Sequence, residues 1–367
     1  MQKFVLAFIY LFNFLINIFK FLLWPMSRNI EIKNICIYRI GSIGDIACAI
    51  PAINNIRNSF PKAKIHFLSS SGKKNDFNSN QLLDIFKIVD EFIIYNKINY
   101  TILKSLRSKN FDLFVELPSD LAKFSNQIRN ILFAYVIKSK KAFGWEIRTL
   151  KFQKKFLNKY VNYDNEVIRL NKIVNTNLKK NYGINYNFPF SKTKKEAILN
   201  KFKLNDLQFL CVSVGGKRKS NIWPTENYTY LIEKIIDKYQ LKILFIGGGE
   251  DSIYTDLIMK QIKNDYKLMI YNLIGKTSFI ESIYILSKSK CLICNDTGTQ
   301  HLASICGTKT FSIFSSRDMK NKWYPYGDSN KVFRAKFECL CYEDNCEKCV
   351  SYLKDIDPEY VLSSIDL

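Results

Sequence analysis

The stretch that decides the fold is ICIYRIGSIGDIACAIPAINNIRNSFPKAKIHFL, which covers residues 35–68. It contains a short apolar run, a turn with two glycines, a longer segment of helical periodicity and a second apolar run. Strand, turn, helix and strand in this order are typical of a βαβ unit with parallel strands. Because ligands of such sheets bind beyond the carboxyl ends of the strands, the turn after the first strand is a candidate functional site.

The same alternation continues along the chain in two series. Strands are predicted at residues 35–39, 64–68, 92–95 and 112–117, with helices at residues 46–60 and 81–89. The second series has strands at residues 209–214, 242–246, 268–273, 290–294 and 310–314. The stretch near residues 181–206, rich in Asn and Lys, is predicted to link the two. A chain of 367 residues has room for two doubly wound α/β domains, at about 150 residues per domain.

The chain carries a large excess of positive charge. Its 55 lysines and arginines against 33 acidic residues give a formal net charge of +22. Such a charge favours anionic partners, among them nucleic acid, an anionic membrane and a phosphorylated glycolipid. We expect no nucleic-acid partner, because no reader motif accompanies the basic residues. A lysine-rich surface without any such partner would give the same charge.

An apolar segment at residues 4–24 precedes the first predicted strand. As a helix it has the length of a bilayer core, about 30 Å. Its polar residues fall on one helical face, which suits a helix lying in the membrane interface, or packed on its own domain, better than a span. These residues are Lys3, Tyr10, Asn13, Asn17 and Lys20. We therefore expect an N-terminal membrane-associating helix, with the rest of the chain in the cytoplasm.

Ten cysteines are present, and six of them lie in apolar strand or helix patterns, as small buried residues of a reduced cytosolic protein do. These six are Cys36, Cys48, Cys211, Cys291, Cys294 and Cys306. The other four are clustered with the spacing C-x-C-x4-C-x2-C: Cys339, Cys341, Cys346 and Cys349. Zinc binding and disulfide bonding are both considered, but the first pair is tight and no long spacer separates two pairs, which argues against a zinc site. Four cysteines with neither a metal nor a disulfide are the alternative.

Asp45 ends the first turn, in the run RIGSIGD at residues 39–45. Two glycines let the backbone turn sharply after the strand. The carboxylate then falls near the N-terminus of the following helix, where the helix dipole favours negative charge. A helix cap and a functional carboxylate are both compatible with this position.

Two loops after strands of the second series contain glycines and charged residues. The first, GGKRKSNIWPTE at residues 215–226, offers Lys217, Arg218 and Lys219 as a grip for a diphosphate, or forms a solvated basic turn. The other, GGGED at residues 247–251, permits close approach to the backbone and offers Glu250 as a partner for ribose hydroxyls.

A further loop of this series reads NDTGTQHLA at residues 295–303. It joins a strand to a helix whose first N–H groups, with Thr297 and Gly298, are suited to hold phosphate oxygens. Asp296 and His301 belong to the same stretch, although a single histidine in a helix is more often structural than catalytic. The loops contain no Walker lysine pattern, His-rich metal set or nucleophile elbow.

Taken in order, these loops resemble those of glycosyltransferase family 9, the ADP-heptose:lipopolysaccharide heptosyltransferases. The similarity runs from residues 35–68 through WPTENYTYLI (223–232) and FIGGGED (245–251) to its strongest part, LIGKTSFIESIYILSKSKCLICNDTGTQHLASICGTKTFSIF (273–314). The tail from Cys339 is also similar to that family's Cys-containing ending before a final helix. The family often has Lys or Arg just before the Trp-Pro pair, whereas this chain has Asn221 and Ile222 there. The identity of the phosphate-holding cation therefore stays open.

The resemblance implies a GT-B fold, in which two Rossmann-like doubly wound domains face a cleft. We expect an N-terminal helix at residues 1–29, an acceptor-binding domain at 30–190, a nucleotide-sugar-binding domain at 191–340, and a tail with a C-terminal helix at 341–367. Asp45 matches the position of the family's catalytic base. The donor-site motif matches Asp296, Thr297, Gly298 and His301, and Glu250 stands where the family contacts ribose.

The implied activity is that of an inverting glycosyltransferase, which moves a heptose or a related sugar from a nucleotide diphosphate donor, ADP-heptose by resemblance, to the lipopolysaccharide core. Asp45 takes the proton of the acceptor hydroxyl, and we assign no metal or cofactor to the reaction. The expected partners are the donor, an acidic acceptor of the Kdo–lipid A type and the cytoplasmic surface of the inner membrane. Basic candidates for the acceptor's acidic groups are Lys73, Lys74, Lys123 and Arg148.

A second hypothesis is a membrane-associated protein that keeps this fold and binds a sugar nucleotide or a glycolipid without turning it over. The presence of both Asp45 and the Asn-Asp-Thr-Gly run favours the enzyme.

Overall fold

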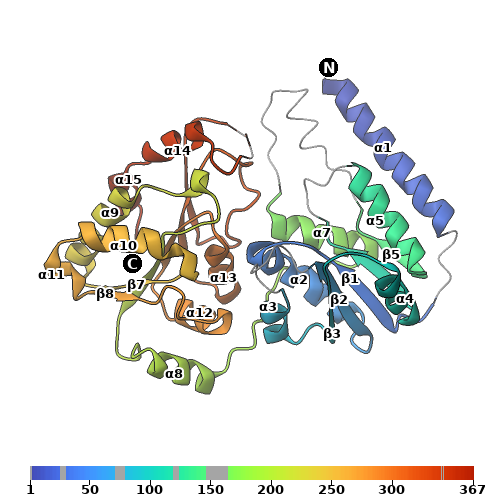
Figure 1. The fold of residues 1–367 in the computed structure, drawn as a ribbon, viewed down its shortest axis with the longest axis horizontal. Helices are drawn as coiled ribbons and strands as arrows, with labels where there is room; N and C mark the ends of the chain where they lie inside the picture. Colours follow the sequence, from blue (N-terminus) through green and yellow to red (C-terminus); the bar gives the residue numbers. More distant parts are fainter. Residues whose placement is uncertain are drawn as a thin grey trace. The chain divides into compact units, whose positions relative to one another are not determined.

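The computed structural model describes residues 2–24, 30–70, 79–118, 124–145, 164–339, 341 and 343–367. The chain forms two compact units, each with its own parallel sheet (Figure 1). The first unit comprises Met1–Asn162 and Val167–Asn187, and the second comprises Tyr163–Glu166 and Phe188–Leu367. Two α/β units with parallel sheets confirm the fold class predicted from the two strand series.

The first unit is built on a five-stranded sheet of order β3-β2-β1-β4-β5. Its strands are β1 (Asn34–Tyr38), β2 (Lys64–Ser70), β3 (Glu91–Tyr95), β4 (Leu113–Glu116) and β5 (Lys141–Phe143). Its helices after the N-terminal one are α2 (Ile43–Ser59), α3 (Ser79–Phe86), α4 (Tyr100–Ser108), α5 (Phe124–Val136) and α7 (Glu166–Leu178). The strand order reverses between β1 and β4, so the carboxyl ends of these two strands form the topological switch point where such sheets bind ligands.

The second unit is built on a six-stranded sheet of order β11-β10-β9-β6-β7-β8. Its strands are β6 (Phe209–Ser213), β7 (Lys242–Phe245), β8 (Ile270–Asn272), β9 (Leu292–Asn295), β10 (Thr310–Phe314) and β11 (Lys331–Arg334). Its α-helices are α8 (Lys192–Lys201), α9 (Thr225–Tyr239), α10 (Ser252–Gln261), α11 (Asn264–Lys267), α12 (Phe279–Leu286), α13 (Gly298–Cys306), α14 (Glu347–Lys354) and α15 (Pro358–Ser363). Two short 3₁₀ turns are η1 (Lys219–Asn221) and η2 (Gly249–Asp251). The switch point lies between β6 and β9.

Central strands of both sheets are mostly apolar because helices cover both faces. Every residue of β6 is buried, and only the first residue of β1 is not. In the second unit, α9 packs with α10 and α15, whereas α12 packs with α13 and α8. The chain leaves the central strand in opposite directions along the sheet, and because the crossovers are right-handed, the two groups of helices lie on opposite faces.

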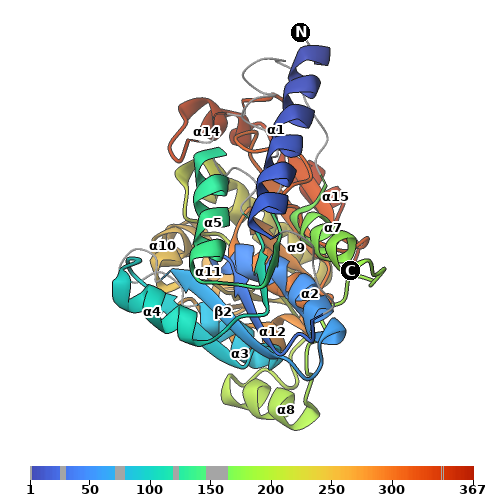
Figure 2. The same cartoon turned by 90° about the vertical axis from the view of Figure 1, so that its right-hand side faces the viewer.

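Helix α1 (Gln2–Leu23) lies beside α5 on the first unit (Figures 1 and 2). Ile16 is 2% exposed within the core cluster, and the Trp24 indole stacks on Trp145 with 5.9 Å between ring centroids. The opposite face leaves large apolar side chains exposed: Leu11, Phe14, Leu15, Ile18, Phe21 and Leu22. No helix among the described residues is both long and apolar enough to cross a membrane. The segment is thus a helix packed on its own unit that also presents an apolar face.

Several elements differ from the sequence-based prediction. The short strands β5 and β11 were not predicted, and helix α8 lies inside the segment predicted as a linker. From the C-terminal segment, Leu353, Val361 and Ile365 pack into the core of the second unit. The fully buried Trp223 also donates from its indole Nε1 to the carbonyl of Ile356 at 3.2 Å. The tail is therefore part of the second unit's packing.

Candidate functional site

Asp45 lies in the first turn of α2, at the carboxyl end of β1. Its Oδ2 accepts hydrogen bonds from the backbone N–H of Ser42 at 2.9 Å and from the Ser42 hydroxyl at 2.8 Å. These bonds close the N-terminus of α2, so the capping role predicted for Asp45 is confirmed. Among the described residues, none donates a hydrogen bond to Oδ1, and the side chain is 25% exposed. One carboxylate oxygen is therefore accessible for chemistry.

Arg39 is a buried hydrogen-bond partner of Asp45 that was not identified from the sequence. Its side chain is 2% exposed, its Nε donates to the Asp45 carbonyl at 2.9 Å, and its Nη1 donates to the Leu117 carbonyl at 3.0 Å. Nη2 lies 3.7 Å from Asp45 Oδ1. Arg39 thus joins the loops after β1 and β4 at the switch point and places a fixed cation beside the carboxylate. The signal in the sequence was an arginine directly after an apolar strand.

Glu116 ends β4, beside Tyr38 in the neighbouring strand β1. It is 3% exposed, and its Oε1 accepts a hydrogen bond from Asn130 Nδ2 at 2.7 Å. Burial raises the pKa of Glu116 to about 7, and the hydrogen bond from Asn130 opposes that rise only in part. Sequence reasoning missed this role, because Glu116 is the last residue of an otherwise apolar strand.

At the switch point of the second unit, Asn295 and Asp296 connect the loops after β9 and β6. Asn295 Nδ2 donates to the carbonyls of Val214 at 2.7 Å and Gly215 at 3.2 Å. Asp296 Oδ2 accepts from Asn221 Nδ2 at 2.9 Å. The sequence-based prediction placed these loops at one sheet edge, and the side chains bond to each other across it. Asn221, where the family often has a cation, is here the link to Asp296.

Burial raises the pKa of Asp296 to about 6, with Asp318 adding to the rise and Arg218 and Arg317 opposing it. Its second oxygen, Oδ1, accepts from Gln300 Nε2 at 3.2 Å. Both carboxylate oxygens are thus hydrogen-bonded, and Asp296 is a fixed part of the loop.

Thr297 and Gly298 stand at the N-terminus of α13, as predicted. Thr297 is the N-cap residue in extended conformation, its side chain makes no capping hydrogen bond, and Gly298 is the first helical residue. The first turn contains no acidic residue. Such an end offers N–H groups and the positive end of the helix dipole to an anion. His301 is 3% exposed, with its ring 6.4 Å from that of Trp323, in a buried position.

The three predicted cations are at the surface of the loop between β6 and α9. Lys217 and Lys219 are exposed, whereas Arg218 Nε donates to Asp344 Oδ1 at 2.7 Å. Asp344 also pairs with Arg317, whose Nη2 lies 3.5 Å away and whose guanidinium is buried. Arg317 follows β10 in the run SSRD, a position at the same sheet edge that sequence reasoning missed.

Glu250 and Asp251 occupy η2, after β7. Glu250 is exposed, as a ribose contact requires, but Asp251 is buried and accepts from the Gly248 backbone N–H at 3.0 Å. Its carboxylate fills the space where a side chain at Gly215 would lie, which explains the glycine there. Burial raises the pKa of Asp251 to about 6, and the nearby Glu250 adds to that rise. Asp251 therefore ties the loops after β6 and β7, a role that the sequence did not reveal.

The four basic candidates for acceptor binding, Lys73, Lys74, Lys123 and Arg148, lie outside the described residues.

Comparisons with known proteins agree with this arrangement. Residues 100–351 match the family Glycosyltransferase family 9 (heptosyltransferase). The lipopolysaccharide heptosyltransferase 2 of Escherichia coli K12 is 24% identical over 182 residues, which cover 48% of this chain and 51% of that protein. The lipooligosaccharide heptosyltransferase 2 of Campylobacter jejuni is 23% identical over 328 residues, which cover 87% of this chain and 93% of that protein.

A solved structure, that of the E. coli ADP-heptose lipopolysaccharide heptosyltransferase II, superposes with a TM-score of 0.66 at 19% identity. The superposition covers 90% of this chain and 96% of that chain. At this level of identity the likeness establishes the fold, which the two doubly wound sheets share with that protein.

The raised pKa of Glu116 predicts a specific pH dependence of stability. The folded state holds the proton to a higher pH than the unfolded state, so the stabilisation is full below about pH 4.5 and is lost as pH rises through about 7. Glu116→Gln imitates the protonated carboxyl and escapes this loss. We expect the stability of the variant relative to the parent to rise by up to about 3 kcal/mol between pH 4 and pH 8. Urea unfolding of both proteins across this range measures the difference, and parallel curves would contradict it.

Proposed function

The chain belongs to glycosyltransferase family 9, the heptosyltransferases, and from this membership we propose that it transfers a heptose or a related sugar from ADP-heptose to the lipopolysaccharide core. The observation that carries the proposal is the N-terminus of α13 at the switch point of the second unit, beside a loop with three cations. The first turn of this helix contains no acidic residue, and the carboxylate that precedes it, Asp296, is hydrogen-bonded to Asn221 and Gln300. Together, the helix N-terminus and the cations can bind the negative charges of a diphosphate. The first unit supplies a carboxylate at the corresponding point of its own sheet.

The proposed donor site lies at the carboxyl edge of the second sheet. Phosphate oxygens accept from the N–H groups of Thr297, Gly298 and the residue after them, and Lys217, Arg218 or Lys219 neutralises their charge. The Arg218–Asp344 pair is exposed, with Asp344 68% exposed, so its loss costs little when phosphate replaces the carboxylate. Glu250, exposed at η2, is the proposed ribose contact. The related E. coli protein of known structure is named for ADP-heptose, which supports this donor.

His301 is proposed to support the donor site without contacting the donor. Its ring is buried against Trp323, and Trp323 Nε1 donates to Asp318 at 3.1 Å. This contact fixes the first turns of α13 against the loop after β10.

The proposed reaction is a single inverting displacement with Asp45 as the base. Asp45 Oδ1 takes the proton of the acceptor hydroxyl while that oxygen bonds to the anomeric carbon and the bond from this carbon to the diphosphate breaks. The cations after β6 and the N-terminus of α13 stabilise the negative charge of the departing ADP, an effect of several kcal/mol when the donors are preorganised. Arg39 holds Asp45 in place through the hydrogen bond to its carbonyl.

The proposed acceptor is an acidic glycolipid of the Kdo–lipid A type, held at the cytoplasmic surface of the inner membrane. The net charge of +22 and the candidates Lys73, Lys74, Lys123 and Arg148 favour an acidic acceptor. The exposed apolar face of α1 provides a surface for contact with lipid, because its docked face already packs on the first unit. This argues for an interfacial helix as the mode of attachment.

The base assignment predicts the effect of Asp45→Asn. The amide oxygen still accepts from Ser42 and keeps the cap, but it takes no proton, so turnover should fall by about 10²-fold or more. Turnover is measured as ADP release from ADP-heptose with a deacylated Kdo–lipid A acceptor, and the dissociation constant of the donor should not change. Ser42→Ala is the control, since it removes one hydrogen bond to Asp45 and leaves the base. Near-normal turnover of Asp45→Asn would reduce Asp45 to a helix cap.

The donor site predicts opposite effects of two similar substitutions at Thr297. Thr297→Asp and Thr297→Asn both supply a good N-cap side chain, so α13 should be as stable or more stable in both. Only Asp brings a negative charge to the proposed phosphate position, where a like charge at about 4 Å costs about 1–4 kcal/mol. We expect Thr297→Asp to bind ADP more weakly than Thr297→Asn by roughly tenfold or more. Calorimetry measures the two affinities. Equal affinities would remove this helix end from the donor site.

The membrane proposal is tested on the exposed face of α1. Phe14 and Phe21 are 61% and 64% exposed, so replacing both with serine should not disturb folding. The loss of about 1.5 kcal/mol of apolar burial per ring should lower binding to anionic lipid vesicles by roughly 10²-fold in a sedimentation assay. Tyr100→Ser is the matched control, because Tyr100 is an aromatic residue of the same unit that is 75% exposed on α4. Unchanged binding of the double variant would contradict an interfacial role for α1.

A further inference from the structure

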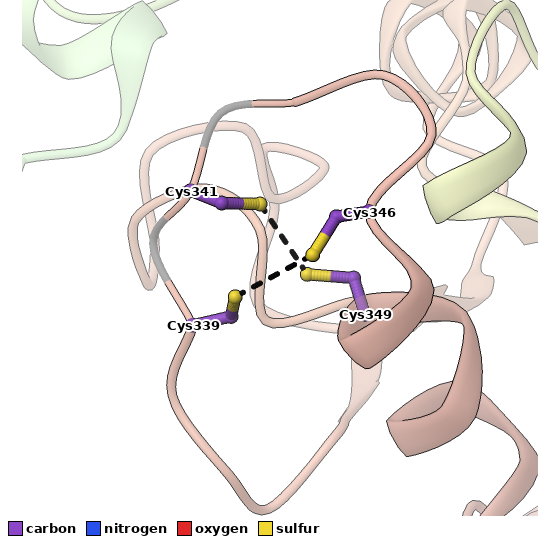
Figure 3. Close-up of side chains that lie close together, drawn as sticks. All are labelled: Cys339, Cys341, Cys346 and Cys349. Carbon is purple, nitrogen blue, oxygen red and sulfur yellow. Dashed lines mark hydrogen bonds between the residues drawn. The ribbon is translucent and has the colours of Figure 1, made fainter.

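Four cysteine sulfurs converge near the C-terminus of the second unit (Figure 3). Cys339 and Cys341 follow β11, Cys346 is the N-cap of α14, and Cys349 lies in its first turn. The sulfur of Cys339 is 3.7 Å from that of Cys346, and the sulfur of Cys341 is 3.6 Å from that of Cys349. All four sulfurs lie within 4.8 Å of one another, and none is in a disulfide.

These separations are close to those of a tetrathiolate metal site. Zinc–sulfur bonds of about 2.3 Å in a tetrahedron place each pair of sulfurs about 3.8 Å apart. Two separate disulfides would require each pair to close to about 2.05 Å, but they give no reason for the two pairs to converge on a common centre. A cluster of several irons needs its cysteine sulfurs farther apart. The arrangement therefore fits a single small ion at the centre of the four thiols.

The groups around the sulfurs suit bound thiolates. The backbone N–H of Glu343 points to the Cys341 sulfur at 3.5 Å, and the Ser316 hydroxyl lies 3.9 Å from the Cys349 sulfur. Such outer contacts orient the ligands of metal sites and offset their charge. Cys346 and Cys349 also lie at the N-terminus of α14, where the helix dipole favours negative charge. Four thiolates around a divalent ion carry a net charge of −2, and the buried guanidinium of Arg317 is nearby in the loop that bonds to Glu343.

We propose that Cys339, Cys341, Cys346 and Cys349 bind one thiophilic metal ion of the Zn²⁺ or Fe²⁺ type in a closed structural site. Four protein ligands leave no open position, so the ion takes no part in sugar transfer. It fastens the segment after β11 to α14, whose Leu353 packs in the core of the second unit.

The site also fixes the loop between its second and third ligands. In that loop the Glu343 carbonyl accepts from the Ser220 hydroxyl at 2.9 Å and from Arg317 Nε at 3.1 Å. The Asp344 carbonyl accepts from the Ser220 N–H at 3.0 Å, and its carboxylate pairs with Arg218. The ion therefore orders the loop after β6 through these contacts, and its removal should loosen residues 215–221 as well as the cysteine segment.

The decisive measurement is the metal content of the full chain, purified in reducing buffer without chelator. Elemental analysis and native mass spectrometry should give one zinc or one iron per chain, and elemental analysis identifies which. The Cys339→Ser/Cys346→Ser double variant should lose the ion. Cys306→Ser is the control: this thiol lies in α13 outside the cluster, and serine repeats its hydrogen bonds to helix carbonyls. A metal-free parent protein, or one that contains two disulfides by thiol-alkylation mass spectrometry, would overturn the proposal.

A second test does not depend on whether the variant folds. The parent protein is stripped with a chelator under reducing conditions and titrated with Co²⁺, which in a tetrahedral thiolate site gives intense visible d–d and thiolate-to-cobalt charge-transfer bands. These should saturate at one equivalent. Hydrogen exchange should then show residues 215–221 and 343–354 more protected with the ion than without it, and the first unit unchanged. The absence of the cobalt bands, or equal exchange in both states, would overturn the site or its ordering role respectively.

Discussion

The carboxamide of Asn295 is the constraint on which the geometry of the second unit's site depends. Its Nδ2 donates to the carbonyls of Val214 and Gly215. Its Oδ1 accepts from the backbone N–H of Trp223 at 3.1 Å and from the Tyr228 hydroxyl at 2.9 Å. Each of these groups is buried, and a buried group left without its partner costs about 1–3 kcal/mol. The Asn295 side chain therefore fixes the end of β9, the loop after β6 and the start of α9 in position relative to one another. Asp296 and the N-terminus of α13 take their positions from it.

The two units have the same sheet order around their switch points but differ in where their carboxylates lie. In the first unit, the helix after the central strand begins with its own carboxylate, Asp45, which already uses the positive end of the helix dipole. In the second unit, the first turn of α13 contains no acidic residue, and the carboxylate that precedes it, Asp296, is hydrogen-bonded to Asn221 and Gln300. The first turn of α2 thus already holds a carboxylate, whereas the N–H groups in the first turn of α13 have no acidic side chain of that turn beside them. This difference, and not the shared fold, is what separates a proposed base from a proposed phosphate site.

The elements that the sequence predicts well are those in which local pattern and burial agree. The strands β1 and β6 lie at the sheet centres, where both faces are covered, so their apolar runs are continuous. The short strand β5 begins with an only partly buried lysine, and β11 has one fully buried residue; both lack such a run. The positions of Asp45 and of residues 295–298 at strand ends were also predicted, because strand ends in a parallel sheet share one edge. By contrast, the roles of Asp251, Asn221 and Arg317 depend on partners distant in sequence, which no local pattern encodes.

The C-terminal segment shows how far such distant contacts determine the site. The carbonyl of Glu343 accepts from Ser220 and from Arg317, and the carboxylate of Asp344 pairs with Arg218 and Arg317. The hydrogen bond from the Ser220 hydroxyl to the Glu343 carbonyl holds the backbone of the cationic loop, whereas the exposed ion pair of Arg218 with Asp344 is worth about 1 kcal/mol or less. An incoming phosphate can therefore displace Asp344 from Arg218 at small cost without releasing the loop. The segment beyond β11 thus keeps the loop in place while its exposed carboxylate neutralises the cation only weakly.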